Sequence, residues 1–281
     1  MADILTHVFR TFIPEAGLTK DVKLISPSST ACSTLMVGER SVSRSVLLLA
    51  AVTAASEMDS KVFFFTQTQI QSLPVSLQSC IPNLSPETLK KIKFSYPRTV
   101  EDLLQQVASL HETVSTAPTP PSLVIVDRLE GYLHGSAGSS SHTGFHQGEQ
   151  SCAAHVSALL CDTAAFLTQI LEQRGSSSAP CRVIASYHSE LQAGSASGEL
   201  PAPDPILAVL DRYFQVRCTL DRDRSCKATA AGLQELWHIF LSGTGLTEAS
   251  PAKGSEVRNV GVAHEWQLVI FPDGLMEFTL V

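Results

Sequence analysis

The sequence lacks the segments that carry a protein into or across a membrane. No apolar run approaches the roughly 20 residues that a membrane span requires. The amino terminus has no basic stretch followed by a signal-like apolar core. We therefore expect no membrane association and a cytosolic or nuclear setting.

Cysteine pairs are also missing. The seven cysteines are scattered, odd in number and form no C-x-x-C motif, so a disulfide framework is not expected. Four residues have spacings that a zinc site uses, namely His142, His146, Cys152 and His155. Since no C-x-x-C pair anchors them, we expect no zinc.

Positive charge is in short supply, because 20 Lys and Arg face 27 Asp and Glu, a formal net charge of −7. This balance argues against a general electrostatic attraction to nucleic acid, so any contact with DNA must be local. Two basic groups are candidates: Lys90, Lys91, Lys93 and Arg98, and later Arg217, Arg222, Arg224 and Lys227. The alternative is that they are ordinary solvated surface charges.

The chain does have enough apolar material for one large core, with 44% hydrophobic residues over 281 positions. Residues 1–30 are predicted to be an N-terminal extension and residues 31–281 the core domain. An amphipathic segment from Ile4 to Phe12 lies within the extension. It is either a helix packed on the core or a docking peptide for a partner.

From residue 34 onward, predicted strands alternate with predicted helices. The core strands are short apolar runs at 34–37, 61–66, 92–96, 123–126 and 182–187. The helices include 45–56, one opened by Thr99 and a long one ended by Gly175. Further strands are expected at 213–220 and 236–241, with a terminal hairpin at 266–280. The pattern predicts an α/β fold with a doubly wound, mostly parallel sheet and antiparallel strands at its carboxyl-terminal end.

One bend between a strand and a helix resembles a phosphate-binding P-loop. Gly38 and Ser45 match the first glycine and the hydroxyl of the template G-x-x-x-x-G-K-[ST]. Ser43 replaces the second glycine and adds a side chain where the loop approaches phosphate. Arg44 replaces the lysine with a bulkier, forked cation. The match predicts weak binding of ATP and Mg²⁺, and the alternative is an ordinary strand, turn and helix.

An aspartate at the end of a buried strand supplies the second half of such a site. Leu123–Val126 is continuous in apolar residues and Asp127 follows it, as in a Walker B strand. Since ligands collect at the carboxyl ends of parallel strands, Asp127 can hold Mg²⁺ opposite Ser45. The alternative is an aspartate that caps a turn. If Asp127 serves only to bind Mg²⁺, it takes no part in packing. We therefore expect Asp127→Asn to leave the fold intact.

Several segments, in order, resemble the core of the RecA-type recombinases and their paralogues. They are the P-loop segment, the run Phe63–Gln67, the strand ending at Asp127, a glycine-rich loop and the Val-Ile-Ala-Ser-Tyr-His segment 183–188. The segments 91–97, 160–165 and 212–214 are most similar to the recombinase-paralogue ATPases of the vertebrate Shu complex. Those proteins act with a SWIM-type zinc-finger protein in homologous recombination. The resemblance extends from about Ser33 to the carboxyl end and implies a RecA-like P-loop core.

The resemblance also implies roles for single residues. The phosphate and magnesium positions fall on Gly38, Ser43, Arg44, Ser45 and Asp127. Gln67 falls where recombinases carry the glutamate that activates water, and an amide cannot accept that proton. His188 falls near the glutamine that senses nucleotide and DNA, and the loops 131–150 and 190–205 fall on the two DNA-binding loops.

These resemblances imply a nuclear DNA-repair factor that pairs with a SWIM zinc-finger protein, binds single-stranded DNA and supports recombinase filaments. Ser43, Arg44 and Gln67 favour a binding subunit with a degenerate nucleotide site. The alternative is an active ATPase of the same fold, stimulated by single-stranded DNA. A metabolic P-loop kinase gains no support, because the sequence has no arginine-rich lid.

Overall fold

A single twisted sheet crosses the described part of the chain. The computed structural model describes residues 4–14, 33–80, 85–116, 119–133, 145–175, 179–189, 204–223, 234–243 and 262–281. Within these ranges nine strands lie in the order β3-β2-β4-β5-β1-β6-β7-β8-β9. Their bounds are β1 Ser33–Val37, β2 Val62–Phe65, β3 Ile92–Ser95, β4 Leu123–Val126, β5 Arg182–Tyr187, β6 Val216–Arg222, β7 Glu235–Gly243, β8 Val262–Ile270 and β9 Met276–Leu280.

The pairing of the strands confirms the predicted fold class. Neighbours from β3 to β6 run parallel, and those from β6 to β9 run antiparallel. The connections between parallel strands contain helices, as right-handed crossovers require. The chain is therefore an α/β protein with a parallel core sheet and an antiparallel carboxyl-terminal part.

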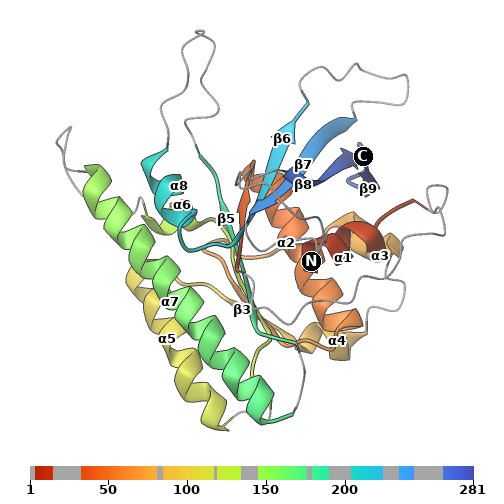
Figure 1. The fold of residues 1–281 in the computed structure, drawn as a ribbon. Helices are drawn as coiled ribbons and strands as arrows, with labels where there is room; N and C mark the ends of the chain where they lie inside the picture. The colour runs from red at the N-terminus through yellow and green to blue at the C-terminus, as the bar shows by residue number, and fades with distance from the viewer. Residues whose placement is uncertain are drawn as a thin grey trace, which may run out of the picture.

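Helices cover both faces of the sheet (Figure 1). They are α1 Ile4–Thr11, α2 Arg40–Glu57, α3 Val75–Cys80, α4 Pro86–Lys90, α5 Val100–Thr116, α6 Leu129–Leu133, α7 Phe145–Gln173 and α8 Pro205–Leu210. The side chains of α1 and α2 pack in one hydrophobic cluster, and those of α5, α6, α7 and α8 pack in another on the opposite face.

The central strands are apolar throughout because both of their faces are covered. Along β4, Ile125 belongs to the cluster with α2, whereas its neighbours Val124 and Val126 belong to the cluster with α7. Side chains of successive strand residues point to opposite faces, so a strand between two helix layers needs no polar positions. This explains why the sequence pattern identified these strands well.

The amino-terminal segment is part of the core. Ile4, Leu5, Val8, Phe9 and Phe12 are all buried. The ring of Phe9 stacks on that of Phe278, with centroids 4.8 Å apart. Of the two interpretations of this segment, packing on the core is correct, and its apolar side is not free to dock a partner. The described part of the predicted extension thus packs on the core domain.

This segment and α3 also cover the outer edge of β9. The backbone N–H of Phe278 donates to the carbonyl oxygen of Phe12 at 3.1 Å. The N–H of Met276 donates to Ser76 Oγ at 2.7 Å. These donors belong to the last strand of the sheet, so both are satisfied within the chain.

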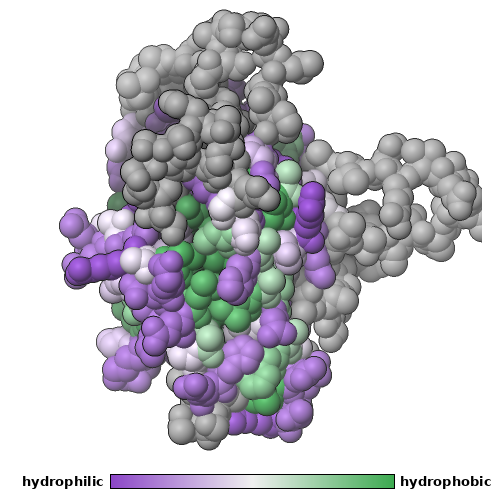
Figure 2. Space-filling view, turned by 90° about the vertical axis from the view of Figure 1, so that its left-hand side faces the viewer, coloured by the Kyte–Doolittle hydropathy of each residue, from purple (hydrophilic) through white to green (hydrophobic). Residues whose placement is uncertain are grey.

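Helix α7 qualifies the expectation about membrane segments. The stretch Gly148–Gln173 is long and apolar enough to cross a membrane by length and composition alone. It packs against α5 and β5, and its Val156, Leu160 and Leu167 are buried in the core. Figure 2 shows hydrophobic side chains gathered in the middle of the face that carries α5 and α7. The core of this domain therefore accounts for part of the apolar character of α7, and Figure 2 shows that other apolar side chains of this face lie on the surface.

Candidate functional site

The bend that resembles a P-loop is mostly helical. Helix α2 begins at Arg40, with Glu39 as its N-cap residue, and not at Ser45 as the sequence pattern predicts. The N–H of Ser43 donates to the carbonyl oxygen of Glu39 at 2.9 Å, which closes the first helical turn. A P-loop needs its N–H groups free to surround phosphate oxygens. Here the N–H groups beyond the first turn of α2 already donate to carbonyl oxygens within the helix.

Two of the residues predicted to bind phosphate make structural contacts within the fold. A Cβ on Gly38 would lie 2.6 Å from Leu220 Cβ, so the close packing of β6 requires glycine at this position. Ser45 Oγ donates to the carbonyl oxygen of Ser41 at 3.1 Å, within the helix. Ser43 is buried, and its hydroxyl has no hydrogen-bond partner among the described residues.

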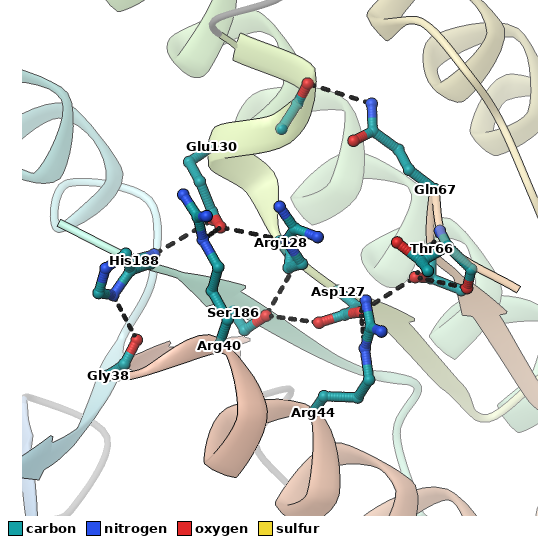
Figure 3. Close-up of polar contacts among 12 residues, drawn as sticks. Gly38, Arg40, Arg44, Thr66, Gln67, Asp127, Arg128, Glu130, Ser186 and His188 are labelled. Carbon is teal, nitrogen blue, oxygen red and sulfur yellow. Dashed lines mark hydrogen bonds and ion pairs between the residues drawn. The ribbon is translucent and has the colours of Figure 1, made fainter. Parts of the chain in front are cut away.

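Arg44 and Asp127 contact each other directly (Figure 3). Both Nε and Nη2 of Arg44 lie 2.8 Å from Asp127 Oδ2. Thr66 Oγ1 donates to the same oxygen at 3.0 Å, and Ser186 Oγ donates to Oδ1 at 3.2 Å. Asp127 is fully buried. The two residues predicted to bind phosphate and Mg²⁺ separately therefore neutralise one another, and both carboxylate oxygens are occupied.

A second buried carboxylate, absent from the sequence predictions, lies beside this pair. Glu130 on α6 is 2% exposed. Its Oε1 lies 3.2 Å from Arg40 Nε and 3.5 Å from Arg128 Nε. The N–H of His188 donates to Oε2 at 3.2 Å. No motif marks this position, and its spacing of three residues from Asp127 was the only available signal.

The backbone around Glu130 is held by further polar contacts. Arg128 has a φ of 65°, a left-handed conformation that is costly for a residue with a Cβ. Its N–H donates to Ser186 Oγ at 2.8 Å. His188 Nδ1 lies 3.0 Å from the carbonyl oxygen of Gly38. The ends of β1, β4 and β5 are thereby joined in one network.

Gln67 lies at the end of β2, as predicted, but acts as a hydrogen-bond donor. Its Nε2 lies 3.1 Å from the carbonyl oxygen of Arg98 and 3.1 Å from that of Gly131. The amide thus joins the start of α5 to α6. It has the geometry of a structural bridge and not that of a base facing water.

One aspartate joins the two sides of the segment 190–203, which lies outside the described residues, as does most of the loop 131–150. Asp204 Oδ1 accepts from the N–H groups of Ile206 and Leu207, capping α8. Its Oδ2 accepts from Tyr187 Oη at 2.9 Å and Ser189 Oγ at 2.7 Å. Burial raises the pKa of Asp204, but these hydrogen bonds outweigh it, and the pKa is lowered from its ordinary value.

Four of the six described basic candidates for DNA contact are paired with carboxylates. Lys90 pairs with Glu87, Lys91 with Asp59, Arg217 with Asp211 and Arg222 with Glu235. Lys93 lies over the ring of Phe63, 5.0 Å from its centroid. Arg98 is exposed and has no ion-pair partner among the described residues. Arg224 and Lys227 lie outside the described residues.

The four residues with zinc-like spacing are only partly described. Cys152 and His155 lie on α7, whereas His142 and the side chain of His146 are outside the described part. Within the residues that the structure describes, no group of three or more His, Cys, Asp and Glu could hold a metal ion.

A pocket of about 560 Å³ opens beside the first turns of α2. Ser41, Arg44 and Ser45 line one side, and the turn at Phe271 and Pro272 lines another. Such a volume is within the usual range for small-molecule sites. The pocket lies next to the residues that the P-loop pattern selects.

Two curated proteins match the chain over most of its length. It is 31% identical to the mouse protein named ATPase SWSAP1 over 245 residues, which are 87% of this chain and 72% of that protein. The chain belongs to the SWSAP1 family. The human SWSAP1 protein is 33% identical over 191 residues, 67% of this chain and 71% of that protein. The predicted relationship to RecA-type recombinase paralogues is confirmed by this membership.

No family model matches the chain. A solved structure, the KaiC-like protein PH0186 from Pyrococcus horikoshii, is 10% identical, with 89% of each chain covered and a TM-score of 0.47. The SWSAP1 proteins carry the name ATPase. As they lie, however, the residues do not fit a bound Mg²⁺–nucleotide, because Arg44 occupies the oxygen of Asp127 that a metal would need.

Proposed function

We propose that this protein is a binding subunit in homologous-recombination repair whose nucleotide site is degenerate. In this role it pairs with a SWIM-type zinc-finger protein in the nucleus, contacts single-stranded DNA and supports filaments of a RecA-type recombinase. The pairing of Arg44 with Asp127 carries the proposal, because it removes both the cation for phosphate and the carboxylate for Mg²⁺. Family membership supports the place of the protein in recombination.

Two further observations support a subunit that does not hydrolyse ATP. The helical start of α2 leaves few N–H groups for phosphate. Gln67 donates to two carbonyl groups, so the usual base position cannot accept a proton.

A repair assay in cells with Ser45→Ala tests this directly. The substitution removes the predicted Mg²⁺ hydroxyl, which bonds only within its own helix, so the fold is expected to stay intact. We expect Ser45→Ala to support repair at the wild-type level. Phe9→Ala, which damages the core, is the control and should lose repair. A repair defect in Ser45→Ala at normal protein abundance would argue for a working ATPase.

The partner is tested by co-expression. The chain is acidic, and four of its six described basic candidates are paired, so it is poorly suited to bind DNA alone. We therefore expect the SWIM protein to raise both the soluble yield and the DNA affinity of this chain, since a ligand of the folded state stabilises it. Equal yield and equal affinity without the partner would contradict this part of the proposal.

The pocket beside α2 favours a second candidate, nucleotide binding by the same fold. Val75 lines the pocket and is exposed, so Val75→Trp fills it without disturbing the core. Leu89→Trp is the matched control, because Leu89 is similarly exposed but does not line the pocket. Binding of a fluorescent ATP analogue that is lost in Val75→Trp alone would support this candidate.

A further inference from the structure

The carboxylate of Asp127 has the surroundings of a metal ligand, but the cation beside it is an arginine (Figure 3). Hydroxyl groups from two neighbouring strands lie next to it: Thr66 Oγ1 is 3.0 Å from Oδ2, and Ser186 Oγ is 3.2 Å from Oδ1. Carboxylate and hydroxyl oxygens are ligands that Mg²⁺ favours. The positive charge at Oδ2 is the guanidinium of Arg44, whose Nε and Nη2 both lie 2.8 Å away.

The ion pair connects one helix to the ends of three strands. Arg44 belongs to α2, Asp127 follows β4, Thr66 follows β2 and Ser186 lies in β5. Arg44 also lines the pocket beside α2, so its guanidinium lies between the pocket and the carboxylate. A metal ion at Oδ2 would have to take the place of this guanidinium.

Of the two charges, the carboxylate depends more on the pair. The side chain of Asp127 is 0% exposed, whereas that of Arg44 is 25% exposed. A buried charge that loses its partner is costly. The neighbouring Arg128 is directed to a different carboxylate, with its Nε 3.5 Å from Glu130 Oε1. The charge of Asp127 is therefore balanced mainly by Arg44.

An arginine differs from a metal ion in ways that make this balance permanent. Its guanidinium stays protonated in proteins, and the chain itself carries it, so its presence does not depend on the concentration of a free ion. Mg²⁺ binds reversibly and gives up its water reluctantly. A site closed by arginine is therefore expected to have the same arrangement with and without metal.

We propose that the guanidinium of Arg44 is a resident cation that replaces Mg²⁺ at Asp127 and holds α2 against the ends of β2, β4 and β5. This rests on the degenerate nucleotide site of the proposed function and adds its regulation: the wild-type protein does not respond to Mg²⁺. Removal of the guanidinium charge turns Asp127 into a site for a divalent cation.

The first measurement counts bound Mn²⁺, used in place of Mg²⁺, by electron paramagnetic resonance of the full chain. Arg44→Met leaves the buried carboxylate without its cation, so this variant should bind one more Mn²⁺ per chain than the wild type. The additional ion should be lost when Asp127→Asn is combined with Arg44→Met. Weak binding to surface carboxylates is common to all three proteins and cancels in the comparison.

Thermal unfolding gives a second readout. Arg44→Met should lower the Tm in NaCl by about 6 to 15 °C, because it breaks a buried ion pair. Mg²⁺ at about ten times its dissociation constant and equal ionic strength should restore about 3 to 6 °C beyond its effect on the wild type. Arg217→Met is the matched control, since Arg217 pairs with Asp211 at 3.0 Å but Asp211 is 37% exposed. We expect no additional response to Mg²⁺ in this control.

Two milder variants keep the test decisive. Arg44→Gln removes the charge but keeps a donor for Asp127, and it is measured in place of Arg44→Met if the latter does not fold. Arg44→Lys keeps a cation and should remain insensitive to Mg²⁺.

The proposal is overturned if the folded neutral variant binds no more Mn²⁺ than the wild type. It is also overturned if the wild type binds an ion that the Arg44→Met, Asp127→Asn double variant lacks. These outcomes are separate from the proposed function, which fails instead if Ser45→Ala abolishes repair.

Discussion

Gln67 points its amide nitrogen at the carbonyl oxygen of Gly131, 3.1 Å away, and a Cβ on Gly131 would clash with the amide oxygen of Gln67. The side chain is thus fixed on α6 by both a hydrogen bond and close packing. Gln67 thus contributes to the fold as a hydrogen-bond donor.

This geometry predicts that glutamate, the residue of the recombinases, destabilises the fold at position 67. Gln67→Glu places a carboxylate oxygen against the carbonyl groups of Arg98 and Gly131. We expect a loss of about 1 to 3 kcal/mol in the free energy of unfolding and no gain in ATP hydrolysis. Urea denaturation measures the loss, and Gln169→Glu on the exposed side of α7 serves as control. Turnover that rises in Gln67→Glu would refute the structural role.

The buried pair predicts that Asp127 is needed for stability. Asp127→Asn removes the charge opposite Arg44 in a fully buried position, so we expect a loss of roughly 3 kcal/mol or more. The expectation from sequence, an intact fold, treated the aspartate as a site residue alone. A double-mutant cycle with Arg44→Met should give a double variant less destabilised than the sum of the single ones. Additive losses would show that the two side chains act independently.

The cap at Asp204 predicts a loss of stability in acid. Because the folded-state pKa is lowered, the contribution of Asp204 is fully present above the unfolded pKa of about 3.9. It is lost as pH falls through the folded pKa. The difference in unfolding free energy between the wild type and Asp204→Asn should be constant from about pH 5 to 7 and shrink below about pH 4. A difference that grows in acid would contradict the assignment.

The packing of α1 predicts that the amino-terminal residues stabilise the fold. Phe9→Ala leaves a cavity between Phe278 and Trp266, which we expect to cost about 3 to 5 kcal/mol. Arg10→Ala, on the same helix but outside the buried cluster, should change little. Equal thermal stability of the two variants would show that this segment does not contribute to the stability of the core.

The basic surface around Arg98 predicts a limited role in DNA binding. Lys93→Ala and Arg98→Ala together should weaken binding of single-stranded DNA several-fold and reduce its salt dependence. Lys90→Ala should have little effect, because Glu87 already neutralises this lysine at 2.7 Å. Anisotropy titrations at two salt concentrations measure both quantities. Equal affinities for all variants would assign DNA contact to another surface.

The fold could be predicted largely because strands such as β4 are buried on both faces and carry an unmistakable apolar run. The arrangement of the site could not, since it depends on which side chains meet across the sheet. The sequence pattern assigned Arg44 to phosphate and Asp127 to Mg²⁺, but it could not show that the two side chains contact each other, because the contact spans 83 positions in the sequence. Glu130 and the bridging role of Gln67 likewise depend on contacts with distant parts of the chain.

The hydrogen bonds from Phe278 to Phe12 and from Met276 to Ser76 affect how such molecules can assemble. A bare terminal strand invites a second chain to continue the sheet, which leads to uncontrolled stacking of subunits. On β9, two of the N–H groups that would pair with that chain already donate to Phe12, which follows α1, and to Ser76 on α3. A second chain could pair with β9 only after the amino-terminal segment had been displaced from the core. The fold therefore disfavours polymerisation through this edge.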